Sequence, residues 1–169
     1  MVSGKSLEKL RNHYKLDNML SSVYVPKIAV KWDDDSLPSQ KKAKSWNCGG
    51  RADYYIIFDW LKDPSKAGVK KVLEIVVDDS GTDGKLPHSD EAILHCLQDL
   101  GVEVWDWKRL DISSDLIFRI AGDHIRQVQL YCSGLNAVLR GWSAVSGLPR
   151  LKNVGQKTFP MLEKHCRVS

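Results

Sequence analysis

An apolar run at residues 72–77, rich in β-branched side chains and broken only by Glu74, is followed at once by two carboxylates, Asp78 and Asp79. A run of this kind suits a central strand of a parallel sheet, covered on both faces. In open α/β sheets, ligands bind outside the carboxyl ends of the strands. The sequence therefore predicts a strand at residues 72–77 and a candidate site directly after it.

Helix and strand patterns alternate around this strand. Their apolar spacing and their flanking Ser, Asp and Gly residues predict helices at 53–61, 89–100, 113–121 and 134–142 and strands at 28–32, 72–77, 102–107 and 127–132, with a last short strand near residue 154. Such alternation is typical of βαβ units, whose right-handed crossovers place helices on both faces of a parallel sheet. We expect a three-layer α/β sandwich, Rossmann-like or flavodoxin-like, with a mainly parallel sheet of four or five strands.

The two segments before residue 53 differ from this alternation. The length of 169 residues, 1–169, fits a single α/β domain. A helical pattern that begins at Ser6 and resumes at Asp17 predicts an N-terminal helical extension over residues 1–25. Residues 33–52 are polar and contain Pro38 and two adjacent glycines, which predicts a long polar loop.

The bulk composition excludes several classes of protein. Hydrophobic residues make up 43% and charged residues 27% of the chain, which is typical of globular domains. No apolar run approaches the ~20 residues that span a bilayer, and the N-terminus lacks a signal-peptide core. The four cysteines are widely spaced without a CxxC pair, as in reduced intracellular proteins. A cytoplasmic protein without membrane contact is the simplest interpretation.

Charge is distributed unevenly along the chain. Residues 1–71 hold 14 Lys and Arg against 8 Asp and Glu, residues 72–125 hold 4 against 12, and residues 126–169 hold 7 against 1. The segments either interleave into a mixed surface or form a basic face for an anionic partner. The candidate interaction residues are the basic cluster and its aromatic neighbour, Lys41, Lys42, Lys44 and Trp46. One such cluster is weak support for nucleic-acid binding, which is the third and weakest functional option.

The carboxylates after residue 77 suggest a metal site. Asp78 and Asp79, with Asp90 nearby, offer the hard oxygen ligands that Mg²⁺ prefers, and no other cofactor is predicted. The alternative is that Asp78 and Asp79 accept hydrogen bonds from amides of the following loop, while Asp90 complements a helix N-terminus.

The same region contains the residue types needed for acid–base chemistry. The candidate catalytic residues are Asp78, Asp79, Asp106 and His88, of which Asp106 is expected near the same edge of the sheet. Helix capping accounts for the Ser89, Asp90 and Glu91 that follow, which leaves His88 as an exposed loop histidine.

A second strand end offers a candidate ligand site. Ser133, Gly134 and Asn136 form a turn into a helix N-terminus, where backbone N–H groups favour anions. If the strands are parallel, this turn emerges on the same edge as Asp78 and Asp79. The turn lacks the further glycines of a phosphate-binding loop.

Two known motifs are incomplete in this chain. Residues 76–83 are similar to the Asp motif of subtilisin-like proteases, but the His and Ser motifs that complete a triad are missing. In a receiver domain, the third strand counted from the acidic pair would end in the phosphoacceptor Asp, where this chain has Cys132 and Ser133. Neither activity is expected.

Six segments carry a wider resemblance: KWDD (31–34), SWNCGGRADY (45–54), FDWL (58–61), HSDEAI (88–93), VWDW (104–107) and LNAVLRGWS (135–143). Together they resemble an accessory domain that lies upstream of subtilisin-like protease domains in large fungal intracellular proteins. The resemblance covers about residues 15–155. It implies a regulatory module and assigns no catalytic residues.

We therefore expect a non-catalytic regulatory or protein-interaction module of a larger cytosolic protein, whose partner is another protein or another domain of a longer chain. The alternative is a Mg²⁺-dependent enzyme that acts on phosphoesters or nucleotides through Asp78, Asp79 and Asp106.

Overall fold

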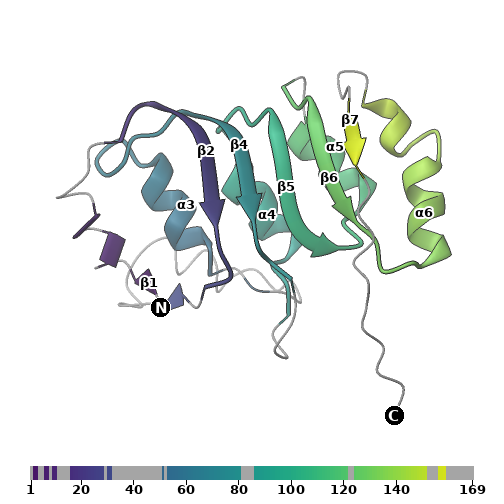
Figure 1. Cartoon of the computed structure of the whole chain (residues 1–169), viewed down its shortest axis with the longest axis horizontal. Helices are drawn as coiled ribbons and strands as arrows, with labels where there is room; N and C mark the ends of the chain where they lie inside the picture. Colours follow the sequence, from purple (N-terminus) through teal and green to yellow (C-terminus); the bar gives the residue numbers. More distant parts are fainter. Residues whose placement is uncertain are drawn as a thin grey trace, which may run out of the picture.

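The computed structural model describes residues 2–3, 6–7, 9–10, 16–28, 30–31, 51, 53–80, 86–121, 124–151 and 156–158 (Figure 1). The predicted interaction residues Lys41, Lys42, Lys44 and Trp46 lie outside these ranges, as does all of the predicted loop except Arg51.

The central feature is a parallel sheet of five strands in the order β2-β4-β5-β6-β7. Its strands are β2 (Met19–Val25), β4 (Lys71–Val77), β5 (Val104–Leu110), β6 (Gln127–Tyr131) and β7 (Gln156–Thr158). Two shorter segments, β1 (Val2–Ser3) and β3 (Val30–Lys31), pair separately and in parallel. The predicted α/β class with a parallel sheet of four or five strands is confirmed, in agreement with the layered folds that include Rossmann-like and flavodoxin-like domains.

The helices follow the predicted alternation from residue 53. They are α3 (Tyr55–Lys62), α4 (Asp90–Leu97), α5 (Ser114–Ala121) and α6 (Asn136–Ser143), with the 3-10 turn η1 (Leu148–Arg150) after α6. Two predicted caps are confirmed, because the Ser89 hydroxyl accepts a hydrogen bond from the Ala92 amide and the Ser113 hydroxyl accepts one from the Leu116 amide, each at 3.2 Å.

The strand order follows the chain without the reversal of a doubly wound sheet. Successive right-handed crossovers in one direction place their helices on one face. Accordingly, α3 contacts α4 and α4 contacts α5, and Figure 1 shows α4 and α5 behind the sheet. The large apolar side chains of the sheet point to this helical face, where Ile75, Val77, Trp105 and Trp107 are fully buried.

The opposite face of the sheet carries polar side chains. Glu74, Asp106 and Gln129 alternate with the buried residues of β4, β5 and β6. Tyr24 on β2 is 59% exposed there. The strands therefore follow the inside–outside alternation of a sheet with one apolar face, in the described part of the chain.

The predicted helical extension over residues 1–25 is wrong for residues 19–25. Helical turns occur at residues 6–7 and 9–10, but Met19–Val25 is the strand β2, paired with β4 through six registered residues. Its sequence, MLSSVYV, ends in β-branched and aromatic residues that fit an edge strand. Pairing with β4 outweighs the helical spacing of its apolar residues.

Among the described residues, no helix has the length and apolar character needed to cross a membrane.

The turn between α6 and η1 depends on a glycine. A Cβ on Gly147 would come within 2.6 Å of the Trp142 carbonyl oxygen and still closer to that of Gly141, whereas a Cβ on Gly141 would meet nothing within 4 Å. Because the obstructing atoms belong to the backbone, they cannot rotate away, and this close approach fixes η1 against α6.

We expect Gly147→Ala to lower the free energy of unfolding by about 1–3 kcal/mol, as overpacking does. Gly141→Ala, in the exposed middle of α6, is the matched control and should raise the free energy by roughly 0.5–1 kcal/mol. Urea denaturation of both variants measures these effects. Equal effects of the two substitutions would contradict the packing described here.

Candidate functional site

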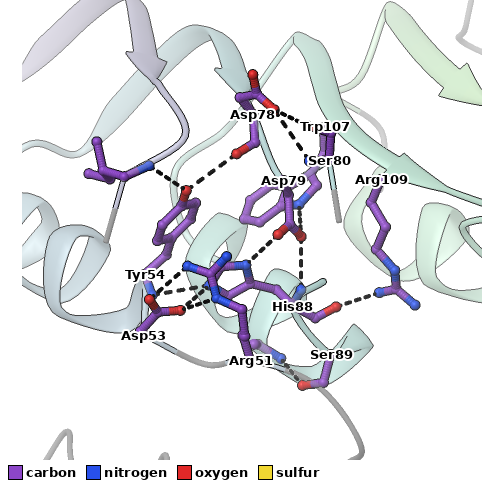
Figure 2. Close-up of polar contacts among 12 residues, drawn as sticks. Arg51, Asp53, Tyr54, Asp78, Asp79, Ser80, His88, Ser89, Trp107 and Arg109 are labelled. Carbon is purple, nitrogen blue, oxygen red and sulfur yellow. Dashed lines mark hydrogen bonds and ion pairs between the residues drawn. The ribbon is translucent and has the colours of Figure 1, made fainter. Parts of the chain in front are cut away.

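The predicted site edge holds a chain of buried polar contacts rather than an open pocket. Asp78 and Asp79 follow β4, Trp107 and Arg109 lie on the last half of β5, and His88 precedes α4 (Figure 2). Of the predicted catalytic candidates, Asp79 and His88 meet here, through side chains that fill the space between the elements.

His88 lies at the centre of this cluster and is not the exposed loop residue that the sequence suggested. Its side chain is fully buried, with Nδ1 2.8 Å from Asp79 Oδ1 and Nε2 2.8 Å from Asp53 Oδ1. The Tyr54 ring packs over it at a centroid distance of 4.1 Å. The imidazole therefore bridges two carboxylates from different parts of the chain.

Asp79 accepts hydrogen bonds from three donors. Its Oδ1 faces His88 Nδ1, and its Oδ2 accepts from the His88 amide and from Trp107 Nε1, both at 2.9 Å. The side chain of Asp79 is 1% exposed. Buried carboxylates persist when they are fully paired in this way, so Asp79 connects β4 to β5 and to the segment before α4.

We call the connected set of Arg51, Asp53, Asp79, His88 and Trp107 the array. The pair formed by Arg51 and Asp53 lies at its other end. Arg51 donates from Nε to Asp53 Oδ1 at 3.0 Å and from a terminal nitrogen to Oδ2 at 2.8 Å, a bidentate geometry. An isolated parallel β-bridge between Arg51 and His88 holds this pair in place. The Arg51 amide donates to the Pro87 carbonyl and the Ser89 amide donates to the Arg51 carbonyl, each at 3.0 Å.

The charges of the array balance when His88 carries a proton on both ring nitrogens. Burial by itself would lower the pKa of His88, but its hydrogen bonds to Asp53 and Asp79 outweigh burial and raise that pKa. Burial would raise the pKa of Asp53, yet the hydrogen bonds from His88 and Arg51 lower it to about 2. Two cations and two carboxylates then compensate one another away from water.

A neutral His88 is the alternative state. The Tyr54 amide lies 3.3 Å from Nε2 and would donate to an unprotonated nitrogen. The Asp53 oxygen is closer, at 2.8 Å, and a contact this short between a carboxylate and a ring nitrogen requires a proton between them. The geometry therefore favours the imidazolium form.

Asp78 is separate from this array although it is adjacent in sequence. Its Oδ1 accepts from the Ser80 hydroxyl at 2.8 Å and from the Ser80 amide at 3.3 Å, which is the loop-capping role that the sequence offered as an alternative. Its backbone carbonyl accepts from the Tyr54 hydroxyl at 3.3 Å.

Asp106 points to the opposite face of the sheet from Trp107. It is 7% exposed and accepts a hydrogen bond from the Tyr131 hydroxyl at 2.8 Å. Burial raises the pKa of Asp106, and the bond from Tyr131 opposes that rise only in part. Asp106 and Asp79 therefore lie on opposite faces and do not share a site.

Asp90 has a structural role at the start of α4. Its Oδ1 lies 2.6 Å from an Arg109 nitrogen, and its Oδ2 accepts from the Ser113 hydroxyl at 3.2 Å. Arg109 also donates to the His88 carbonyl at 2.9 Å. Asp90 thus joins the start of α4 to β5 and to the start of α5.

The predicted ligand residues Ser133, Gly134 and Asn136 do not form one site. The Ser133 amide and hydroxyl both donate to Asp111, at 2.8 and 2.5 Å, so a carboxylate occupies the position expected for an anion. Gly134 adopts a left-handed conformation with φ of 88° and turns the chain. Asn136 is exposed at the start of α6 and lines a groove between α6 and η1.

The carboxylates do not converge as a Mg²⁺ site. Within the described ranges, no group of three His, Cys, Asp or Glu side chains is placed to hold a metal ion. Asp79 uses its oxygens for three N–H donors, and Asp90 is paired with Arg109. A metal ion could bind these residues only by replacing hydrogen bonds that connect the elements.

Sequence reasoning missed the partners that close the array. The place of Asp53 at the start of the predicted helix 53–61 is typical of a cap, but Tyr54 occupies the N-cap of α3 and Asp53 pairs with Arg51 and His88. Trp107 is fully buried in the core, and its indole N–H also donates to Asp79. The spacing of Arg51 and Asp53, with opposite charges two residues apart, was the one available signal.

Comparison with protein-family models, with curated proteins and with solved structures finds no match for this chain. The resemblance to a protease-associated accessory domain therefore stays a prediction, and the chemistry of the chain is argued from its own geometry.

We expect the adjacent carboxylates to respond differently to the same substitution. Asp79→Asn replaces one carboxylate oxygen by an NH2 group, so that a donor would face the N–H donors of His88 and Trp107. This should lower the free energy of unfolding by about 3–5 kcal/mol, as breaking a buried pair does. Asp78→Asn keeps an acceptor for Ser80 and should change stability by less than about 1 kcal/mol. Chemical denaturation measures both, and similar losses would show that Asp79 is not specially placed.

The array also predicts the pH dependence of stability. Because the pKa of His88 is raised, its contribution is complete below the ordinary value of 6.5 and is lost as pH rises through the raised value. Because the pKa of Asp53 is lowered from 3.8 to about 2, its contribution is present above 3.8 and is lost as pH falls toward 2.

The free energy of unfolding, measured across this range, should therefore include a decline on the alkaline side that His88→Gln removes. Asp53→Asn should instead reduce the acid-side decline. An unchanged alkaline limb in the His88 variant would contradict the imidazolium assignment.

Proposed function

We propose that this chain is a non-catalytic regulatory or protein-interaction module, acting in the cytoplasm as part of a larger protein. The observation that carries the proposal is the closed array at the carboxyl edge of the sheet. His88 and Asp79, the residues best suited to chemistry there, are buried and spend their polar atoms on one another and on Trp107. A catalytic base must reach the proton that it abstracts, and both ring nitrogens of His88 already face carboxylates, those of Asp53 and Asp79.

Exposed apolar side chains near α6 also support this proposal. Leu135 is 59% exposed, Leu139 46% and Val145 90%, and all three lie in or next to α6. Exposed apolar side chains that gather on one element are typical of protein-interaction surfaces. The sequence resemblance, which implies a module accompanying a subtilisin-like protease domain in a fungal protein, agrees with an interaction role.

The alternative function, a Mg²⁺-dependent enzyme acting on phosphoesters or nucleotides, needs Asp78, Asp79 and Asp106 around one ion. Asp106 lies on the other face of β5 from the Asp79 contact with Trp107, and Asp78 accepts a hydrogen bond from Ser80.

Nucleic-acid binding through Lys41, Lys42, Lys44 and Trp46 would be tested by salt-sensitive binding that is lost when the lysines are replaced.

Thermal unfolding with and without millimolar Mg²⁺ or Mn²⁺ separates the first two functions. A metal bound only by the folded chain raises the melting temperature, so the interaction module should show no rise and no metal-dependent hydrolysis of a generic phosphoester. A rise that Asp78→Asn abolishes, together with hydrolysis, would replace our proposal by the enzyme.

A further inference from the structure

A groove of about 650 Å³ lies between α6 and η1, away from the buried array. Its base is apolar and buried, with Trp142 4% and Leu148 6% exposed. Leu139 and Pro149 add apolar surface at its sides, and the polar lining residues are Asn136, Arg140 and Ser143. This volume lies within the range of cavities that hold a ligand or a large side chain.

The groove is fixed in shape by the contacts beneath it. Trp142 Nε1 donates to the Ile112 carbonyl at 2.8 Å, which ties α6 to the segment between β5 and α5. The close approach of Gly147 to Gly141 and Trp142 sets the position of η1. Arg150, on η1, lies over the Phe118 ring of α5 at 3.9 Å. A preformed groove loses little conformational freedom when it is occupied.

Among the described residues that line the groove, one is charged, Arg140. The described stretch 126–151 contains Arg126, Arg140 and Arg150 and no Asp or Glu. Arg126 pairs with Glu103 and Arg150 lies over the Phe118 ring, whereas the exposed guanidinium of Arg140 has no ion-pair partner within the described ranges. A carboxylate of a partner could therefore pair with Arg140, and no Asp or Glu is among the described residues that line the groove.

Apolar surface continues from the groove along α6. Leu135 and Leu139 are four residues apart and so lie on the same side of the helix, and both are about half exposed or more, at 59% and 46%. An occupant with one large apolar side chain in the groove would cover this surface as well. Nucleic acid fits poorly, because a polyanion needs several cations and gains nothing from Leu135 and Leu139.

We propose that the groove between α6 and η1 binds an acidic peptide segment of a partner protein. One large apolar side chain of the segment packs between Leu139 and Leu148 above Trp142, and a neighbouring carboxylate pairs with Arg140. This proposal rests on the interaction role proposed above and names the chemistry of its partner.

The proposal is tested by selecting, from a library of short random peptides, those that bind the purified chain. The selected peptides should be enriched in Asp and Glu around at least one Trp, Phe or Leu. Arg140→Glu and Leu139→Ser should each weaken their binding by about tenfold or more, since like charges and lost apolar contact both cost affinity. The matched controls are Arg119→Glu and Leu86→Ser, which change exposed residues outside the groove lining and should leave affinity unchanged.

A charge exchange completes the test. Peptides with Lys in place of their acidic residues should lose binding to the natural chain and regain it with Arg140→Glu. The proposal is overturned if no peptide is selected, if the selected peptides lack acidic residues, or if Arg140→Glu binds them unchanged. Displacement of the peptide by a short single-stranded DNA at equal affinity would overturn it in favour of nucleic acid.

The two proposals fail separately. Loss of the peptide site without metal-dependent hydrolysis would leave the interaction role in place at another surface, whereas metal-dependent hydrolysis would remove the interaction role itself.

Discussion

The contact between Asp79 and His88 is the interaction on which the carboxyl edge of the sheet depends. Through it, a residue that follows β4 holds the indole of β5, the segment before α4 and, by way of Asp53, the segment before α3. Asp79, His88 and Trp107 are buried and Asp53 is mostly buried, and each of these polar groups would be costly to leave unpaired. Because every member has its partner, four stretches of chain that are far apart in sequence meet in one arrangement.

This closure decides where function can lie. In parallel α/β sheets the carboxyl ends of the strands usually carry the ligand site, because the loops there surround an open space. Here His88 and Asp79 fill that space with a neutral set of ion pairs, and Ser133 is satisfied by Asp111. The surface near α6 is different, since its groove has a buried apolar base and, among the described residues that line it, an arginine and no carboxylate. We therefore propose that recognition takes place at α6 and that the role of the strand edge is structural.

The sequence predicted the fold better than it predicted the site. Apolar periodicity from residue 53 onward located each later helix and strand, because each element must bury one face, and Ser89 and Ser113 marked two helix starts. Periodicity failed for Met19–Val25, where pairing with β4 decides the conformation. The site depends on which polar residues meet across the fold. Asp79 and His88 could be named from sequence, but their contact, and the burial of His88, follow from long-range packing that no local pattern records.

The protonation state of His88 is the most direct test of the central claim that this array is a closed, charge-balanced structural element. Nitrogen NMR of the imidazole ring near neutral pH reports whether each ring nitrogen carries a proton. We predict that both ring nitrogens carry protons at pH values where a free imidazole, with its ordinary pKa of 6.5, has begun to lose one, and that these protons exchange slowly with water. A ring that titrates near 6.5 with rapid exchange would show an accessible, neutral histidine and would contradict the account.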